Sequence, residues 1–162
     1  MHQELHALFD EDQADRRGEL PAALRRRDER RRRRVEQLLA QGTVTDPDDL
    51  FCAAMVFQRG TDRAHYLEAH ELARRAAELG STRPARWLAA AAHDRWLMAG
   101  GLPQKYGTQY RSVGGRWVLY QVDPTTSDEE RARWDVPPLA EALRRADEMT
   151  RDDRDGRQGG GP

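Results

Sequence analysis

Cysteine, lysine and long apolar runs are nearly absent from this chain of 162 residues. Its one cysteine, Cys52, excludes an internal disulfide and any metal site built from several cysteines. No apolar run approaches the roughly 20 residues that a membrane-spanning helix needs. The start of the chain is polar and acidic and lacks the apolar stretch of a secretory signal. We therefore expect a cytoplasmic protein with no membrane partner.

Apolar residues are also scarce, at 38% of the chain against 34% charged residues. This length suits one domain of ordinary size, and this composition allows only a small core. We expect a single helical domain over residues 1–150. The charged and then glycine-rich residues 151–162 lack the apolar side chains needed to fold, so they are predicted to be a disordered tail.

Lys105 is the only lysine among 27 basic residues, and eight arginines lie between Arg25 and Arg34. With Asp28 and Glu29 subtracted, that segment carries a net charge of +6 (eight minus two). It could lie along an anionic partner such as nucleic acid or a phosphorylated ligand. It could instead be a solvated helix braced by its own acidic residues, including Glu36. No aromatic residues interleave the run and the whole chain has a net charge of −1, so the sequence disfavours nucleic acid.

Apolar residues at helical spacing, bounded by glycine and proline, predict a mainly helical fold. The first expected helices cover residues 2–16, 22–41, 47–59, 62–79 and 84–99. Asp46 stands before Pro47 as a cap, and Ser81 or Thr82 is expected to cap the helix that has Pro84 in its first turn. The short connections make successive helices antiparallel neighbours.

A two-residue turn at Gly114-Gly115 divides two β-prone segments, Gln109–Val113 and Arg116–Val122. Such a turn between alternating residues predicts a β-hairpin over about 109–122 that is free to cover the helices. A short helix from Ser127 to Trp134 and a last helix from about 137 to 150 complete the expected fold. The fold class is therefore a mainly α bundle of helical hairpins with one β-hairpin.

Asp94 and Arg95 fall within an apolar face of the helix over 84–99. Burying these ions is costly unless they are paired and hydrogen-bonded. The nearest polar segment is the loop Gln104–Gln109, so we expect it to fold back over both side chains. The two residues would then either anchor the loop or belong to a binding site.

Three histidines come from the same block of helices. His65 and His70 are five residues apart, about 140° around the helix, so they do not form a metal-binding pair on one face. His65 falls on the expected buried face and His70 at its edge, while His93 comes from the next helix. No compact spacing supplies the three or four ligands of a zinc site, so neither metal nor cofactor is expected. Cys52 is interpreted as a small buried apolar residue.

Five stretches between Leu50 and Leu143 carry a resemblance: AAMVFQRG, AHELARRAAELG, ARWLAAAAHDRWLM, GLPQKYGTQY and WDVPPLAEAL. They resemble a bacterial family defined as a domain of unknown function, and the Pro-Gln-x-Tyr-Gly-Thr-Gln loop at 103–109 is the most specific part. Related sequences carry a histidine where this chain has Arg59. At the level of repeats the block also resembles Sel1-like and tetratricopeptide-type helical hairpins, in which small residues let helices approach closely. The resemblance implies a fold and a focal loop.

Two functions are compatible with these patterns. The favoured one is a non-catalytic binding module, because helical hairpins offer a groove for a protein or peptide. This hypothesis predicts an open groove lined by Phe51, Phe57 and Tyr66.

The alternative is a metal-independent enzyme acting on a small anionic molecule. In it, His93, Asp94 or His65 would move a proton, and Arg95 with Lys105 would hold the anion. The residues assigned to binding are Arg95, Gln104, Lys105, Tyr106, Thr108, Gln109 and His70. This hypothesis predicts an enclosed pocket in which Asp94, Arg95 and a histidine converge.

Overall fold

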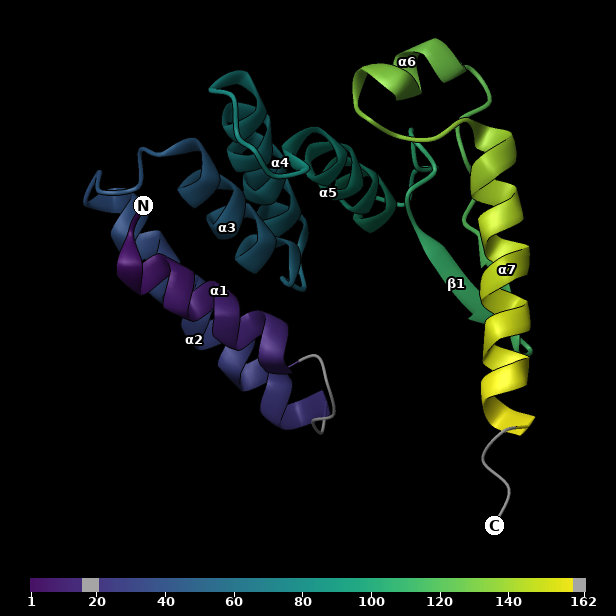
Figure 1. Ribbon diagram of the computed structural model, residues 1–162, viewed down its shortest axis with the longest axis horizontal. Coiled ribbons are helices and arrows are strands. Elements are labelled where there is room, and N and C mark those ends of the chain that lie inside the picture. The colour runs from purple at the N-terminus through teal and green to yellow at the C-terminus, as the bar shows by residue number, and fades with distance from the viewer. Residues whose placement is uncertain (16–20, 159–162) are drawn as a thin grey trace.

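The computed structural model describes residues 1–15 and 21–158. The helices are α1 (Gln3–Asp15), α2 (Pro21–Ala40), α3 (Pro47–Gln58), α4 (Arg63–Glu78), α5 (Ala85–Ala99), α6 (Asp128–Arg133) and α7 (Leu139–Gln158). Strands β1 (Tyr110–Val113) and β2 (Arg116–Leu119) pair antiparallel. The mainly helical fold with one β-hairpin is confirmed (Figure 1).

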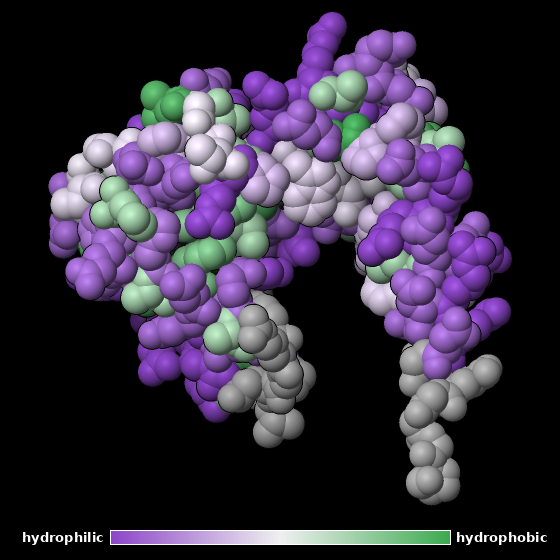
Figure 2. Space-filling model, viewed as in Figure 1, coloured by the Kyte–Doolittle hydropathy of each residue, from purple (hydrophilic) through white to green (hydrophobic). Residues whose placement is uncertain are grey.

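Helices α3, α4 and α5 stand between two limbs of the molecule (Figure 1). One limb is the antiparallel pair α1–α2, and the other contains the β-hairpin and α7. The space-filling view shows an open gap between the limbs (Figure 2). Helices α3, α4 and α5 thus join the two limbs.

The main core lies among the first five helices, with α3 at its centre. Leu50, Ala53 and Ala54 of α3 are fully buried. Small residues of α4 such as Ala69 and Ala73, also fully buried, allow α4 to pack closely between α3 and α5. Helix α1 covers the other side of α3, where the Phe9 and Phe51 rings meet edge to face at 6.5 Å.

A smaller second core joins α5 to the C-terminal part of the chain. It consists of Ala90, Tyr106 and Val136, with the half-buried Trp134 packed against it. Trp134 also packs against the main core. This junction is small and contains one tyrosine, so packing alone gives limited stabilisation there.

The β-hairpin turns at Gly114 and Gly115, whose φ angles of 58° and 77° suit the two-residue turn that the sequence predicted. It packs against α7 rather than against the central helices. The Trp117 backbone N–H donates to Thr150 Oγ1 at 2.9 Å, and its indole N–H donates to Asp153 at 2.8 Å. Helix α7 continues to Gln158, so residues 151–158 of the predicted disordered tail are helical, and residues 159–162 lie outside the described part.

The predicted cap of α5 is wrong. Pro84 occupies the capping position and no side chain caps the helix. Ser81 Oγ and Thr82 Oγ1 instead donate to Asp48 of α3, at 2.6 and 2.7 Å. These hydrogen bonds hold the pKa of Asp48 below its ordinary value. The turn between α4 and α5 is thereby tied to the start of α3.

Replacing Asp48 tests its hydrogen bonds to the turn between α4 and α5. We expect Asp48→Ala to lower the free energy of unfolding by about 1–2 kcal/mol at neutral pH, because the accepted hydrogen bonds are charge-assisted but partly exposed. A carboxylate whose pKa is lower in the folded than in the unfolded state stabilises the fold at pH values above its unfolded pKa. The difference in unfolding free energy between Asp48→Ala and wild type should therefore shrink as pH falls through about 4. Urea unfolding of both proteins at several pH values measures the loss of stability and its pH dependence. A loss that is the same at every pH would contradict the hydrogen bonds assigned to the ionised Asp48.

Candidate functional site

Asp94 lies in the middle of α5 and is completely buried. Its Oδ1 accepts the backbone N–H groups of Lys105 and Tyr106 at 2.7 and 2.8 Å. Its Oδ2 accepts those of Gly107 and Thr108 at 3.1 and 3.0 Å, and the Thr108 hydroxyl at 2.8 Å. We call Asp94 and the backbone of residues 105–108 the Asp94 cradle. The predicted return of the loop over Asp94 is confirmed.

The cradle is a concave backbone nest of the kind that binds anions. Four successive N–H groups can converge on one carboxylate here because Gly107 has a φ of 88°, which side-chain-bearing residues rarely adopt. The nest is filled from within the chain, since both Asp94 oxygens are already engaged. This geometry favours the anchoring interpretation of Asp94 over proton transfer.

Gln104 closes the base of the loop and is also completely buried. Its side-chain N–H₂ donates to the carbonyls of Gln109 and Tyr120 at 3.1 and 2.9 Å. Its Oε1 accepts the Gln109 backbone N–H at 2.9 Å. Gln104 therefore joins the loop to the β-hairpin instead of facing a ligand.

Arg131 of α6 holds the loop from the opposite side and is only 2% exposed. Its Nε donates to the Tyr106 carbonyl at 3.0 Å, and one terminal nitrogen donates to the Thr126 carbonyl at 2.6 Å. Arg131 could not be predicted from the sequence, because nothing in its local pattern separates it from the many exposed arginines. The loop is thus held by a carboxylate from α5 and a guanidinium from α6.

Arg95 also meets the loop, as predicted. Its Nε donates to Gln109 Oε1 at 3.0 Å, and a terminal nitrogen donates to the Gln58 carbonyl at 3.1 Å. The guanidinium lies 6.0 Å from the Tyr66 ring centroid. Arg95, Tyr66, Gln109 and Tyr120 border an open surface hollow of about 420 Å³. Arg95 therefore links α3 to the loop at the edge of this hollow.

His93 and His70 meet in an aromatic cluster beside the loop, with ring centroids 5.2 Å apart. The His93 ring also contacts Trp96 and Tyr106, at 5.7 and 5.9 Å. Burial, and then the neighbouring His70, hold the pKa of His93 below its ordinary value. A nitrogen of His70 lies 2.9 Å from the Ala89 carbonyl, where it acts as donor. We call His70, His93, Tyr106 and Trp134 the histidine cluster.

The other two predicted residues lie in different surroundings. His65 contacts Phe57 at 6.4 Å between ring centroids and Asp62 at 3.2 Å, so its partners differ from those of His93. Lys105 forms an ion pair with Glu130 at 2.6 Å, which raises the pKa of its amine. The structure therefore does not gather the predicted acid–base and anion-binding residues around one space.

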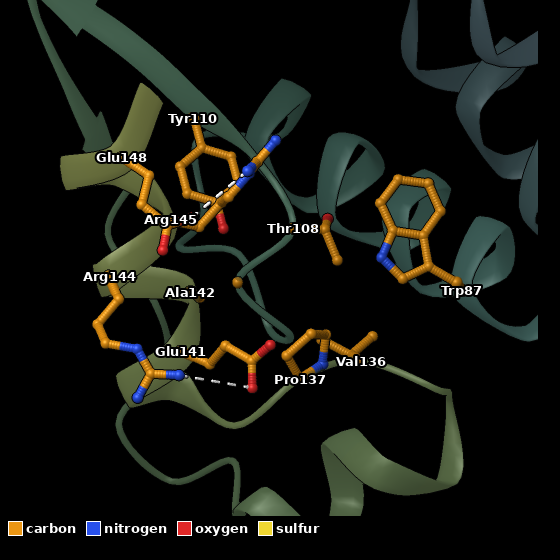
Figure 3. A pocket seen from close by; sticks show the side chains of 11 residues that line it. Trp87, Thr108, Tyr110, Val136, Pro137, Glu141, Ala142, Arg144, Arg145 and Glu148 are labelled. Carbon is orange, nitrogen blue, oxygen red and sulfur yellow. Dashed lines mark hydrogen bonds and ion pairs between the residues drawn. The ribbon is translucent and has the colours of Figure 1, made fainter. Parts of the chain in front are cut away.

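A groove opens where α5, the loop and α7 meet (Figure 3). Its volume is about 420 Å³. The residues that line it are Trp87, Gly107, Thr108, Tyr110, Val136, Pro137, Glu141, Ala142, Arg144, Arg145 and Glu148. We call it the Trp87 groove. Figure 3 shows Trp87 on one side, the charged side chains of α7 on the other, and Val136 and Pro137 between them.

Only Thr108 among the predicted binding residues lines the Trp87 groove. Trp87 lies two helical turns before Asp94 on the same face of α5, a signal that the sequence offered. The predicted groove at Phe51 and Phe57 is wrong, because α3 is central and these side chains are 6% and 3% exposed. Tyr66 is half-buried and borders the hollow beside Arg95.

Over residues 1–15 and 21–158, no group of three or more histidine, cysteine, aspartate or glutamate side chains is placed to hold a metal ion. Burial raises the pKa of the Cys52 thiol to about 11, so the thiolate is disfavoured. No helix in this part of the chain combines the length and hydropathy needed to cross a membrane.

Comparison with known proteins gives no relative: no protein-family model, curated protein or solved structure matches the chain. The resemblance to a family with a Pro-Gln-x-Tyr-Gly-Thr-Gln loop and to Sel1-like repeats stays a prediction.

Removing the Asp94 carboxylate tests the cradle. We expect Asp94→Ala to lower the free energy of unfolding by about 3 kcal/mol or more, because buried N–H groups lose their acceptor. Sodium formate should restore part of the loss relative to sodium chloride at equal ionic strength, since its carboxylate fits the vacated nest. Asp94→Asn is the matched control: it should be unstable and insensitive to formate, because the amide fills the site. Urea midpoints equal to wild type in both variants would refute the cradle.

The histidine cluster predicts a pH dependence. A histidine with a depressed pKa stabilises the fold above its unfolded pKa, about 6.5, and that contribution is lost as pH falls below it. As pH is lowered from about 7 to about 5, we expect wild type to lose stability that His93→Phe keeps, so the unfolding free energy of the variant should rise relative to that of wild type. Urea unfolding of both proteins across this range measures the change. A stability difference that is the same at every pH would argue against a neutral, buried His93.

Proposed function

We propose that the chain is a non-catalytic binding module and that the Trp87 groove receives an extended, uncharged apolar segment of a partner protein. The observation that carries the proposal is Trp87, a large aromatic side chain left 38% exposed beside a preformed groove. Tryptophan, tyrosine and arginine dominate the energetics of protein interfaces, and the groove has all three types.

The lining of the groove indicates the chemistry of the segment. Val136 and Ala142 contribute an apolar floor. The charges on α7 are paired along the helix, Arg145 with Glu148 at 3.4 Å and Arg144 with Glu141 at 3.9 Å (Figure 3). The rim therefore carries no net charge, which suits an uncharged ligand. Aromatic grooves of this kind receive extended apolar or proline-containing peptides.

The catalytic alternative lacks comparable support. It requires Asp94, Arg95 and a histidine to face a common pocket. Asp94 is fully buried and accepts five hydrogen bonds, and no histidine or cysteine among the described residues lines the Trp87 groove. This distribution of polar groups supports binding rather than proton transfer.

Selection from a displayed library of random peptides tests the proposal. We expect the wild-type protein to enrich peptides with an apolar or aromatic anchor and no net charge. A selected peptide should bind Trp87→Ala about thirtyfold more weakly, the loss typical of an interface hot spot. Fluorescence anisotropy measures this affinity.

Leu67→Ala is the matched control, because Leu67 is similarly exposed at 43% but lies on α4 and does not line the groove. It should bind the selected peptide as wild type does. Equal affinity of wild type and Trp87→Ala for the selected peptides would exclude the groove as the binding site. The absence of any enriched sequence would count against the proposed partner.

A further inference from the structure

Helix α2 carries arginines in two parallel rows, and one row already holds an acidic helix. Arg27, Arg31 and Arg34 follow a spacing of four and three residues and face α1. Arg27 Nε donates to Asp15 at 2.9 Å, Arg31 also pairs with Asp15, and Arg34 donates to Glu4 at 2.9 Å. Glu4 pairs near the end of α2 and Asp15 near its start, so α1 lies antiparallel. We call these three arginines the inner row.

The second row repeats the same spacing one residue earlier. Arg26, Arg30 and Arg33 are four and three residues apart, so they share one side of α2 over about 10 Å. All three are exposed and line an open hollow of about 450 Å³. Arg33 pairs with Glu29 on its own helix. No carboxylate in residues 1–15 or 21–158 lies within ion-pair distance of Arg26 or Arg30. We call these arginines the outer row.

We propose that the outer row docks an acidic amphipathic helix of a partner protein, held as the inner row holds α1. Guanidinium groups bind carboxylates through paired N–H donors, which makes arginine suited to such a surface. Carboxylates at matching intervals along one helix face would reach the three arginines together. This surface lies on α2, whereas the Trp87 groove is lined by residues of α5, the loop and α7. Figure 1 shows α7 on the limb opposite α1 and α2.

The surroundings of the outer row favour an acidic protein helix over nucleic acid. Glu29 pairs with Arg33 and lines the same hollow, so charges of both signs lie along this side of α2. The mixed side chains of a protein helix can match such a surface, whereas a uniformly negative phosphate backbone cannot. Ala23 adds an apolar edge to the hollow.

Two labelled peptides of identical composition test the geometry of this surface with the full-length protein. Both are alanine-based helices; one places its glutamates at i, i+4, i+7 and i+11 on one face, and the other spreads them around the helix. We expect the one-faced peptide to bind about tenfold more tightly in fluorescence anisotropy, because only it can form several ion pairs at once.

The variant Arg26→Gln/Arg30→Gln/Arg33→Gln should lose this preference. The control Arg75→Gln/Arg86→Gln/Arg116→Gln removes the same charge at exposed arginines on other elements and should keep the preference for the one-faced peptide. Thermal unfolding checks that both variants are folded. Equal binding of the two peptides, equal losses in both variants, or no binding of either peptide would overturn the proposal. So would an oligo-dT strand that binds more tightly than the one-faced peptide and depends on the outer row.

Discussion

The carboxylate of Asp94 lies inside an apolar helix, where a charge is costly unless hydrogen bonds surround it. Four backbone N–H groups and one hydroxyl supply those bonds, so the contact that satisfies the charge also fixes residues 105–108. The β-hairpin follows this loop directly, and Arg131 of α6 donates a hydrogen bond to the Tyr106 carbonyl of the loop. Asp94 is therefore the buried charge that fixes this loop against α5, beside the Arg95–Gln109 hydrogen bond and the second core.

The Trp87 groove is a consequence of that placement. One of its walls belongs to α5, another to α7, and the loop forms the side between them. The apolar junction of Ala90, Tyr106 and Val136 is small, and the hydrogen bonds of the cradle add to its hold on the loop. A binding surface built across a junction stays preformed only if the junction is rigid. The polar residues of the loop serve that rigidity more than they serve ligand contact.

Much of this frame could be predicted from the sequence, because local rules decide it. Glycine pairs, capping residues and apolar spacing indicated the helices and the hairpin, and the ions within an apolar helix indicated a loop that folds back over them. Three features depend on distant contacts instead. Ser81 and Thr82 donate hydrogen bonds to Asp48 of α3. Neighbouring elements cover Phe51 and Phe57. Helix α7 extends beyond the residues whose apolar spacing predicted it, and it packs on the hairpin. Arg131 became prominent only once its burial was known. For Trp87 the sequence shows the helical spacing from Asp94, but not the exposure of the ring.

Hydrogen exchange of individual backbone amides measures the central interaction most directly. If the Asp94 carboxylate fixes the loop, the amides of Lys105, Tyr106, Gly107 and Thr108 should exchange as slowly as buried amides of α5, through the same global unfolding event. A loop is otherwise among the first segments to open. Fast exchange of these four amides, with α5 still protected, would show that the carboxylate does not hold the loop and would remove the basis for a preformed groove.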